Sequence, residues 1–202
     1  PYLQTSETLF RVETLRHQAR VLIGGMAQRA QVFWASQAEQ QYQVLREIGA
    51  ALLSTFDVPQ LMDMLAEELP HLGIPGCYLS LYENPTAYEY PQSAPAWSRL
   101  ILGYNEQGRL TIDADGQRFP SSQLVPEGLL PQEKVFDMIL VPLYFREKQL
   151  GFALFEVVSR DKTPFETLRI QISTALQGAL LVEAYKQAVD ELAATNQELE
   201  SF

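Results

Sequence analysis

The chain has 202 residues, of which 47% are hydrophobic and 20% charged, a composition typical of a globular protein with a buried core. Its formal net charge of −10 disfavours general nucleic-acid binding, which needs a concentrated basic surface. The longest apolar runs are too short to cross a bilayer, so we expect no membrane contact, and the single cysteine excludes an internal disulfide framework and suits a cytoplasmic protein.

The first quarter of the chain is predicted to form one long helix or two stacked helices. Residues 6–55 contain no proline, and their apolar residues recur at intervals of three and four. Gly24 and Gly25 are the natural place for a kink, because glycine weakens a helix interior. Large apolar residues are sparse here, so we expect the helix to pack against a second copy of itself. We assign 1–39 as an N-terminal signalling helix.

A second helix and three strands are expected next. Asp57 is predicted to cap a helix that begins at Val58 and ends before Gly73. Strands are predicted over 77–82, 97–104 and 109–113.

Residues 114–134 contain three prolines and no repeating pattern, which predicts a long loop; loops of this length are usually either lids over a binding site or disordered segments. We name four of its residues as candidates for the lining of a ligand pocket: Arg118, Phe119, Ser121 and Ser122.

Two apolar runs, MILVPLYF and LGFALFEVV, predict an antiparallel hairpin across the polar residues 146–149. Neither run alternates cleanly, so we expect the hairpin to lie in the middle of the sheet, with helices on at least one face. Gly151 is expected to allow another backbone or a helix to approach closely.

The final helix is predicted to begin at Thr163 and Pro164 and to run to the end of the sequence. Six of its residues follow a heptad pattern, with the first of each pair at position a and the second at d: Val182 and Tyr185, Val189 and Leu192, Asn196 and Leu199. Valine and a single asparagine at a, with leucine at d, favour two parallel helices in one register. The alternative is an amphipathic helix that lies on its own domain.

Motifs of catalysis and metal binding are missing from the sequence. The two histidines are far apart, and neither stands near Cys77 at the spacing of metal ligands, so we expect no metal site. Neither a nucleophile elbow nor a phosphate-binding or dinucleotide-binding glycine motif is present. We expect Cys77 to be a buried small hydrophobe, and we expect no enzymatic activity.

The order of elements, with the hairpin VPLYFREKQLGFALFE, resembles a GAF domain, the small-molecule-sensing relative of PAS, over about 40–186. The resemblance implies an α+β fold with an antiparallel sheet and helices on one face. We expect the long N- and C-terminal helices to extend it into a dimeric coiled coil. No cofactor is expected: the cyclic-nucleotide signature is not recognisable, and Cys77 is followed by Tyr78 where bilin-binding members have histidine.

The end of the sequence, ELAATNQELESF, resembles the linker before the phosphoacceptor helix of sensor histidine kinases. The resemblance implies a sensory and dimerising module of a bacterial two-component sensor, with an output linker over 182–202 and a kinase or other output domain after Phe202. The alternatives are a ligand-free dimerising spacer, the input domain of a diguanylate cyclase or transcription regulator, and a catalytic GAF domain that would need an exposed Cys77.

Overall fold

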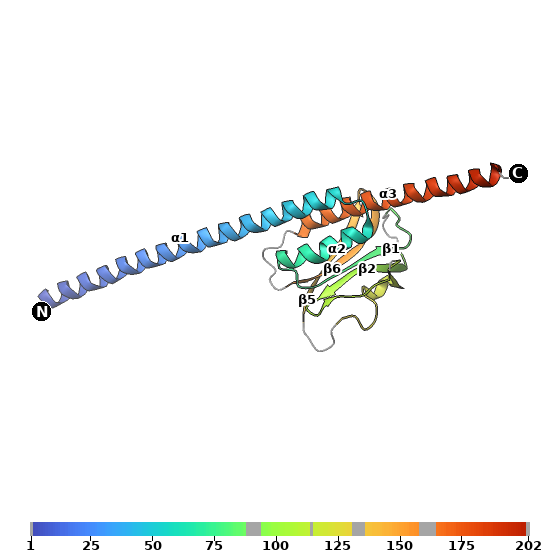
Figure 1. Ribbon diagram of the computed structural model, residues 1–202. Coiled ribbons are helices and arrows are strands. Elements are labelled where there is room, and N and C mark those ends of the chain that lie inside the picture. Colours follow the sequence, from blue (N-terminus) through green and yellow to red (C-terminus); the bar gives the residue numbers. More distant parts are fainter. Residues whose placement is uncertain (1, 88–93, 114, 131–135, 158–164, 201–202) are drawn as a thin grey trace. The chain divides into compact units, whose positions relative to one another are not determined.

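The computed structural model describes residues 2–87, 94–113, 115–130, 136–157 and 165–200 (Figure 1). The chain divides into two units, Pro1–Gln43 and Val44–Phe202. The elements in chain order are the helices α1 (Tyr2–Ser54) and α2 (Val58–Glu68), the short 3₁₀ helix η1 (Leu69–Leu72), the strands β1 (Cys77–Tyr82), β2 (Trp97–Asn105), β3 (Gly108–Arg109) and β4 (Gln117–Pro120), the 3₁₀ helix η2 (Ser121–Gln123), the strands β5 (Asp137–Phe145) and β6 (Lys148–Val157), and the helix α3 (Phe165–Glu200).

Helix α1 is continuous and runs through Gly24 and Gly25 without a break. A Cβ atom added at Gly24 would meet no other atom within 4 Å, so close packing does not explain the glycine at this position. In the second unit, the last turns of α1 bury Leu45, Ile48 and Leu52. The apolar spacing of this segment therefore reflects its packing in the core.

Helix α2 begins at the predicted cap. The Asp57 side chain accepts a hydrogen bond of 3.0 Å from the backbone N–H of Gln60, which satisfies one of the free donors of the first turn. Pro59 also lies in that turn, where a missing N–H costs nothing. The helix passes into η1, which Gly73 ends in the left-handed conformation, with φ of 79°.

The sheet is antiparallel and has the order β3-β2-β1-β6-β5, with β4 paired to the same strand as β3. The predicted α+β class is therefore confirmed. The expected strand over 109–113 is wrong, because only Gly108 and Arg109 pair, at one end of β2. The other end of β2 pairs with β4, which lies inside the segment expected to be a loop. A turn at Gly116, with φ of 76°, brings the chain back to that end.

The predicted hairpin consists of β5 and β6, but only β6 lies inside the sheet. In the described part of the sheet β5 is an edge strand, so the expected central position is wrong for it. Its alternate residues Leu140 and Tyr144 are 49% and 41% exposed. Pro142 lies between them, and its missing N–H suits an edge strand because no hydrogen bond of an inner ladder is lost.

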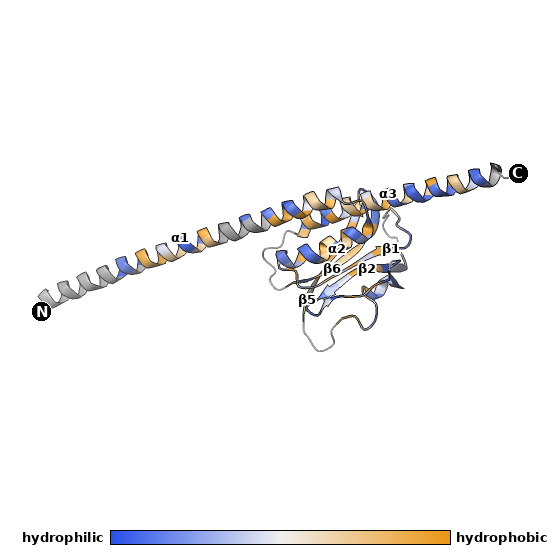
Figure 2. Ribbon diagram, viewed as in Figure 1, coloured by the Kyte–Doolittle hydropathy of each residue, from blue (hydrophilic) through white to orange (hydrophobic). Residues whose placement is uncertain are grey.

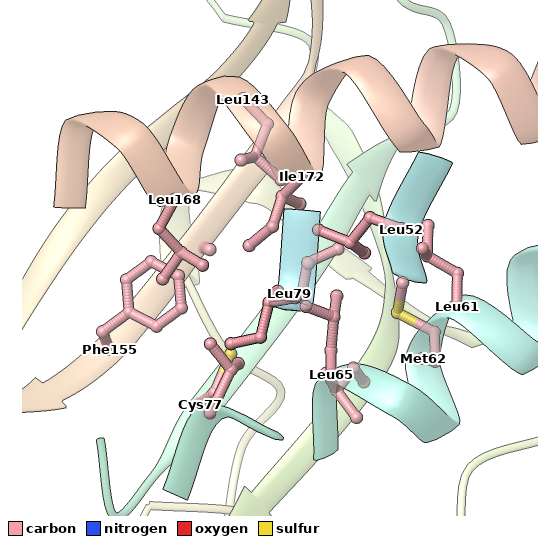
Figure 3. Packing of buried hydrophobic residues seen from close by; sticks show 14 of the residues in the cluster. Leu52, Leu61, Met62, Leu65, Cys77, Leu79, Leu143, Phe155, Leu168 and Ile172 are labelled. Atoms are coloured by element: carbon pink, nitrogen blue, oxygen red, sulfur yellow. The ribbon is translucent and has the colours of Figure 1, made fainter. Parts of the chain in front are cut away.

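Two buried clusters lie on opposite faces of the sheet. The larger cluster joins the end of α1, α2 and α3 to one face (Figure 3), with Leu52, Leu65, Leu79, Phe155 and Ile172 among its members. The second cluster is formed by strand residues and by the chain after β4. Within the described ranges, no helix is long and apolar enough to cross a membrane.

Candidate functional site

Among the described residues of the second unit, large exposed apolar side chains gather on the C-terminal half of α3. Its first half is held in the core by Leu168, Ile172, Leu176 and Ala179, which are all 5% exposed or less. Beyond Ala179, Leu180 and Val182 are half-buried. The other large apolar residues that follow are exposed by 65% at Leu181, 71% at Tyr185, 44% at Val189 and 65% at Leu192.

The predicted heptad residues therefore lie on a helix segment that the domain does not cover. Val182 is half-buried at the point where α3 leaves the core, and Asn196 is exposed. The side chain of Leu199 lies outside the described residues. Figure 2 shows hydrophobic residues recurring among hydrophilic ones along this part of α3. Leu181 was not among the predicted residues, although its spacing of four from Tyr185 was a usable signal.

The four loop candidates for a ligand pocket have different surroundings. Phe119 is 3% exposed and packs edge-to-face on Phe152, with ring centroids 6.5 Å apart. The hydroxyl oxygens of Ser121 and Ser98 lie 2.7 Å apart in a buried hydrogen bond. Ser122 is exposed. Two of the four thus anchor β4 and η2 to the sheet, and a role for them in ligand binding stays a prediction.

Arg118, the fourth candidate, belongs to an ion-pair cluster centred on Glu83. Its Nε donates a hydrogen bond of 2.8 Å to the Glu83 carboxylate, and its guanidinium lies 3.8 Å from the centre of the Trp97 ring. Arg99 contacts the same carboxylate at 3.1 Å. The hydrogen bond from Arg118 and the charges of both arginines hold the pKa of Glu83 below its usual range. The cluster ties β4 to the ends of β1 and β2.

The sheet face opposite the helices is occupied by large side chains. Tyr78, Leu100, Phe152 and Leu154 of the strands pack with Phe119 and Val125, and all six are 5% exposed or less. Leu129 and Leu130 pack against this cluster, and the Tyr78 hydroxyl donates to the Leu129 carbonyl at 3.4 Å. The segment expected to be a lid thus contributes apolar side chains to a packed core.

The cysteine and the two histidines have different surroundings. Cys77 is completely buried among apolar side chains (Figure 3), and this burial raises the pKa of its thiol far above the usual value. His17 and His71 are both exposed. No group of three potential metal ligands is present among the residues that the structure describes.

Comparison with known proteins yields structural neighbours only. No family model and no curated protein matches the sequence. A GAF domain of a phosphoenolpyruvate-protein phosphotransferase from Coxiella burnetii is 12% identical, with a TM-score of 0.50 over 73% of this chain and 98% of that chain. The corresponding domain from Acinetobacter is 15% identical, with a TM-score of 0.46 over 72% of this chain and 97% of that chain. A phycoerythrobilin-bound GAF domain of a cyanobacterial phytochrome is 16% identical, with a TM-score of 0.46 over 71% and 98%. The similarity to the Coxiella burnetii domain shows that this chain has a GAF fold.

Proposed function

We propose that this chain is a dimerising GAF module that transmits a signal through α3 to an attached output domain. The observation that carries the proposal is the exposed heptad stripe of α3. The C-terminal half of α3 buries no face against its own domain. Such a helix segment is only marginally stable in water, because most helical stability in proteins comes from packing. A second α3 would cover Tyr185, Val189 and Leu192, which are now 71%, 44% and 65% exposed.

The sequence of the stripe supports a parallel pair of helices. Asn196 occupies position a, and two such side chains can satisfy each other's hydrogen bonds only when the helices run in the same direction and lie level. In an antiparallel pair each asparagine would face an apolar layer and lose its partner, at a cost of roughly 1–3 kcal/mol. Both copies of α3 would then deliver their C-terminal ends to the same place.

The output domain that we favour is a histidine kinase after Phe202, on the resemblance of ELAATNQELESF to the linkers of such kinases. The same geometry would serve a diguanylate cyclase or a transcription regulator, which also act as dimers joined to an input domain. The module itself has no catalytic role in this proposal, since the thiol of its cysteine is buried.

The packing of the second sheet face disfavours a ligand at that face. Tyr78, Phe119 and Phe152 occupy the space between the sheet and the loop after β4. A ligand on this face would have to displace buried aromatic side chains, each of which stabilises the fold by roughly 1.5–3 kcal/mol. We therefore propose that the signal does not originate in this second cluster.

Disulfide trapping tests the parallel pair. In the variant Asn196→Cys the two thiols face each other across a parallel, in-register interface, so mild oxidation should give a covalent dimer rapidly. The matched control is Ala194→Cys, because residue 194 lies on the outer side of the same helix turn. Equal and slow trapping of both variants, or a monomer in sedimentation, would refute the proposed interface.

A further inference from the structure

A groove of about 810 Å³ lies where α2 begins, next to the ends of β1 and β2. Ile112, Asp113 and Asp115 complete its wall, together with Leu180 and Glu183 of α3. Its apolar lining comes from α2, β1, β2, the chain after β3, and α3. The residues are Val58 and Met62, Leu81, Ile101, Ile112 and Leu180, in that order. The volume falls within the range of about 300–1,000 Å³ that is common for small-molecule sites. The groove therefore has room for a ligand with an apolar body.

The free charges at the edge of this groove are negative. Asp113, Asp115 and Glu183 line it, and their carboxylates have no hydrogen-bond or ion-pair partner within the described residues. Arg109 contacts the carboxylate of Asp63, and Arg99 shares the carboxylate of Glu83 with Arg118. The lining holds four carboxylates and two arginines, a formal balance of −2, which disfavours an anionic ligand.

We propose that this groove binds a small organic cation, an ammonium group joined to an apolar body. The apolar body would cover the side chains of Met62, Ile101 and Leu180, while the ammonium group would lie at the edge of the groove, beside one or more of its exposed carboxylates.

Occupancy of the groove would act directly on α3. Leu180 and Glu183 lie where this helix leaves the core, between Ala179 at 1% exposure and Tyr185 at 71%. A bound cation would join this turn of α3 to α2 and to the strand ends. The regulatory consequence rests on the proposed transmission through α3, whereas binding itself does not.

Isothermal titration of the whole chain with three probes of similar shape tests the class of ligand. The probes are 2-phenylethylammonium, 3-phenylpropanoate and the neutral 3-phenylpropan-1-ol. We expect saturable binding of the ammonium probe, with a Kd at least about tenfold lower than that of either other probe. Absence of ammonium binding in a titration that detects a Kd of ~1 mM, or equal binding of the carboxylate, would overturn the proposal.

Charge-removing variants locate the binding. Asp115→Asn and Glu183→Gln should each weaken ammonium binding about two- to fivefold, the range expected for solvent-exposed ion pairs. Glu191→Gln is the matched control, because it removes an exposed carboxylate of the same helix outside the groove. Unchanged affinity in the Asp115→Asn/Glu183→Gln double variant would place the binding elsewhere and overturn the site.

Sedimentation measures the oligomeric state and so tests the proposed dimer independently of ligand binding in the groove. A monomer that binds the ammonium probe contradicts the proposed function and leaves the groove intact as a site. A dimer that does not bind the probe overturns the groove alone.

Discussion

Gly151 allows β1 and β6 to pair at normal distance. A Cβ atom at this position would lie 2.0 Å from the carbonyl oxygen of Ser80 and 2.8 Å from the Cα of Leu81. Both are backbone atoms of the neighbouring strand and cannot rotate away. Gly151→Ala is therefore expected to lower the free energy of unfolding by about 3 kcal/mol, measured by urea denaturation.

The matched control for this variant is Gly178→Ala on α3, where no atom lies within 4 Å of an added Cβ. Alanine favours a helix interior over glycine, so the control should raise the free energy of unfolding by about 1 kcal/mol. A Gly151→Ala protein as stable as the parent would contradict the close approach of β6 to Ser80.

Cys77 gives a second prediction for a single residue. Its thiol is buried, and the raised pKa leaves almost no thiolate at neutral pH, so the folded protein should react with Ellman's reagent far more slowly than the urea-unfolded chain. Because the pKa is raised, increasing the pH to 9 should not restore the reaction while the protein stays folded. Fast labelling of the native protein would favour the catalytic alternative.

Gly24 and Gly25 determine the local stability of α1. Both lie inside a continuous helix, beside the exposed side chains of Val21, Leu22, Ile23 and Met26. Each glycine costs a helix interior about 1 kcal/mol relative to alanine, so the backbone should open here more often than elsewhere in α1. Gly24→Ala and Gly25→Ala should each slow amide hydrogen exchange over 20–30 by about fivefold, measured by mass spectrometry. Unchanged exchange in both variants would show that the glycines do not limit opening.

The agreement between sequence and structure is best for elements with a local signal. Asp57 marks the start of α2 because its cap uses a neighbour three residues away, and β1 has the predicted bounds Cys77–Tyr82. Position within the sheet was harder to predict, because apolar runs are typical of inner strands. Pro142 was the available signal that β5 is an edge strand.

Strand β4 was missed for a physical reason that lies outside its own sequence. The segment QRFP has no apolar alternation, and it pairs because Gly116 turns the chain back along a neighbouring strand. The groove was also missed, because it depends even more on residues that are distant in the sequence. It combines Met62, Arg99 and Glu183, which no periodicity connects, whereas the stripe on α3 lies within one helix and was found by its spacing.

At the scale of the whole molecule, folding uses the first half of α3, and the proposed association would use the second half. The core of the second unit includes α3 only as far as Ala179, and residues 183–197 are all exposed. Residues 187–197 therefore contribute little to the packing of the domain. In the proposed dimer residues 187–202 contribute four of the six heptad positions: Val189, Leu192, Asn196 and Leu199.

Deleting residues 187–202 should consequently weaken dimerisation without unfolding the domain. We expect sedimentation equilibrium to give a monomer at concentrations where the whole chain is a dimer, with thermal unfolding of the truncated domain still cooperative. Leu192→Asp should have the same effect because it places a charge in the interface, whereas Ala194→Asp adds the same charge on the outer side and should leave the dimer intact. If the truncated chain associates as tightly as the parent, the contact between copies lies in another part of the chain, and α3 does not join them.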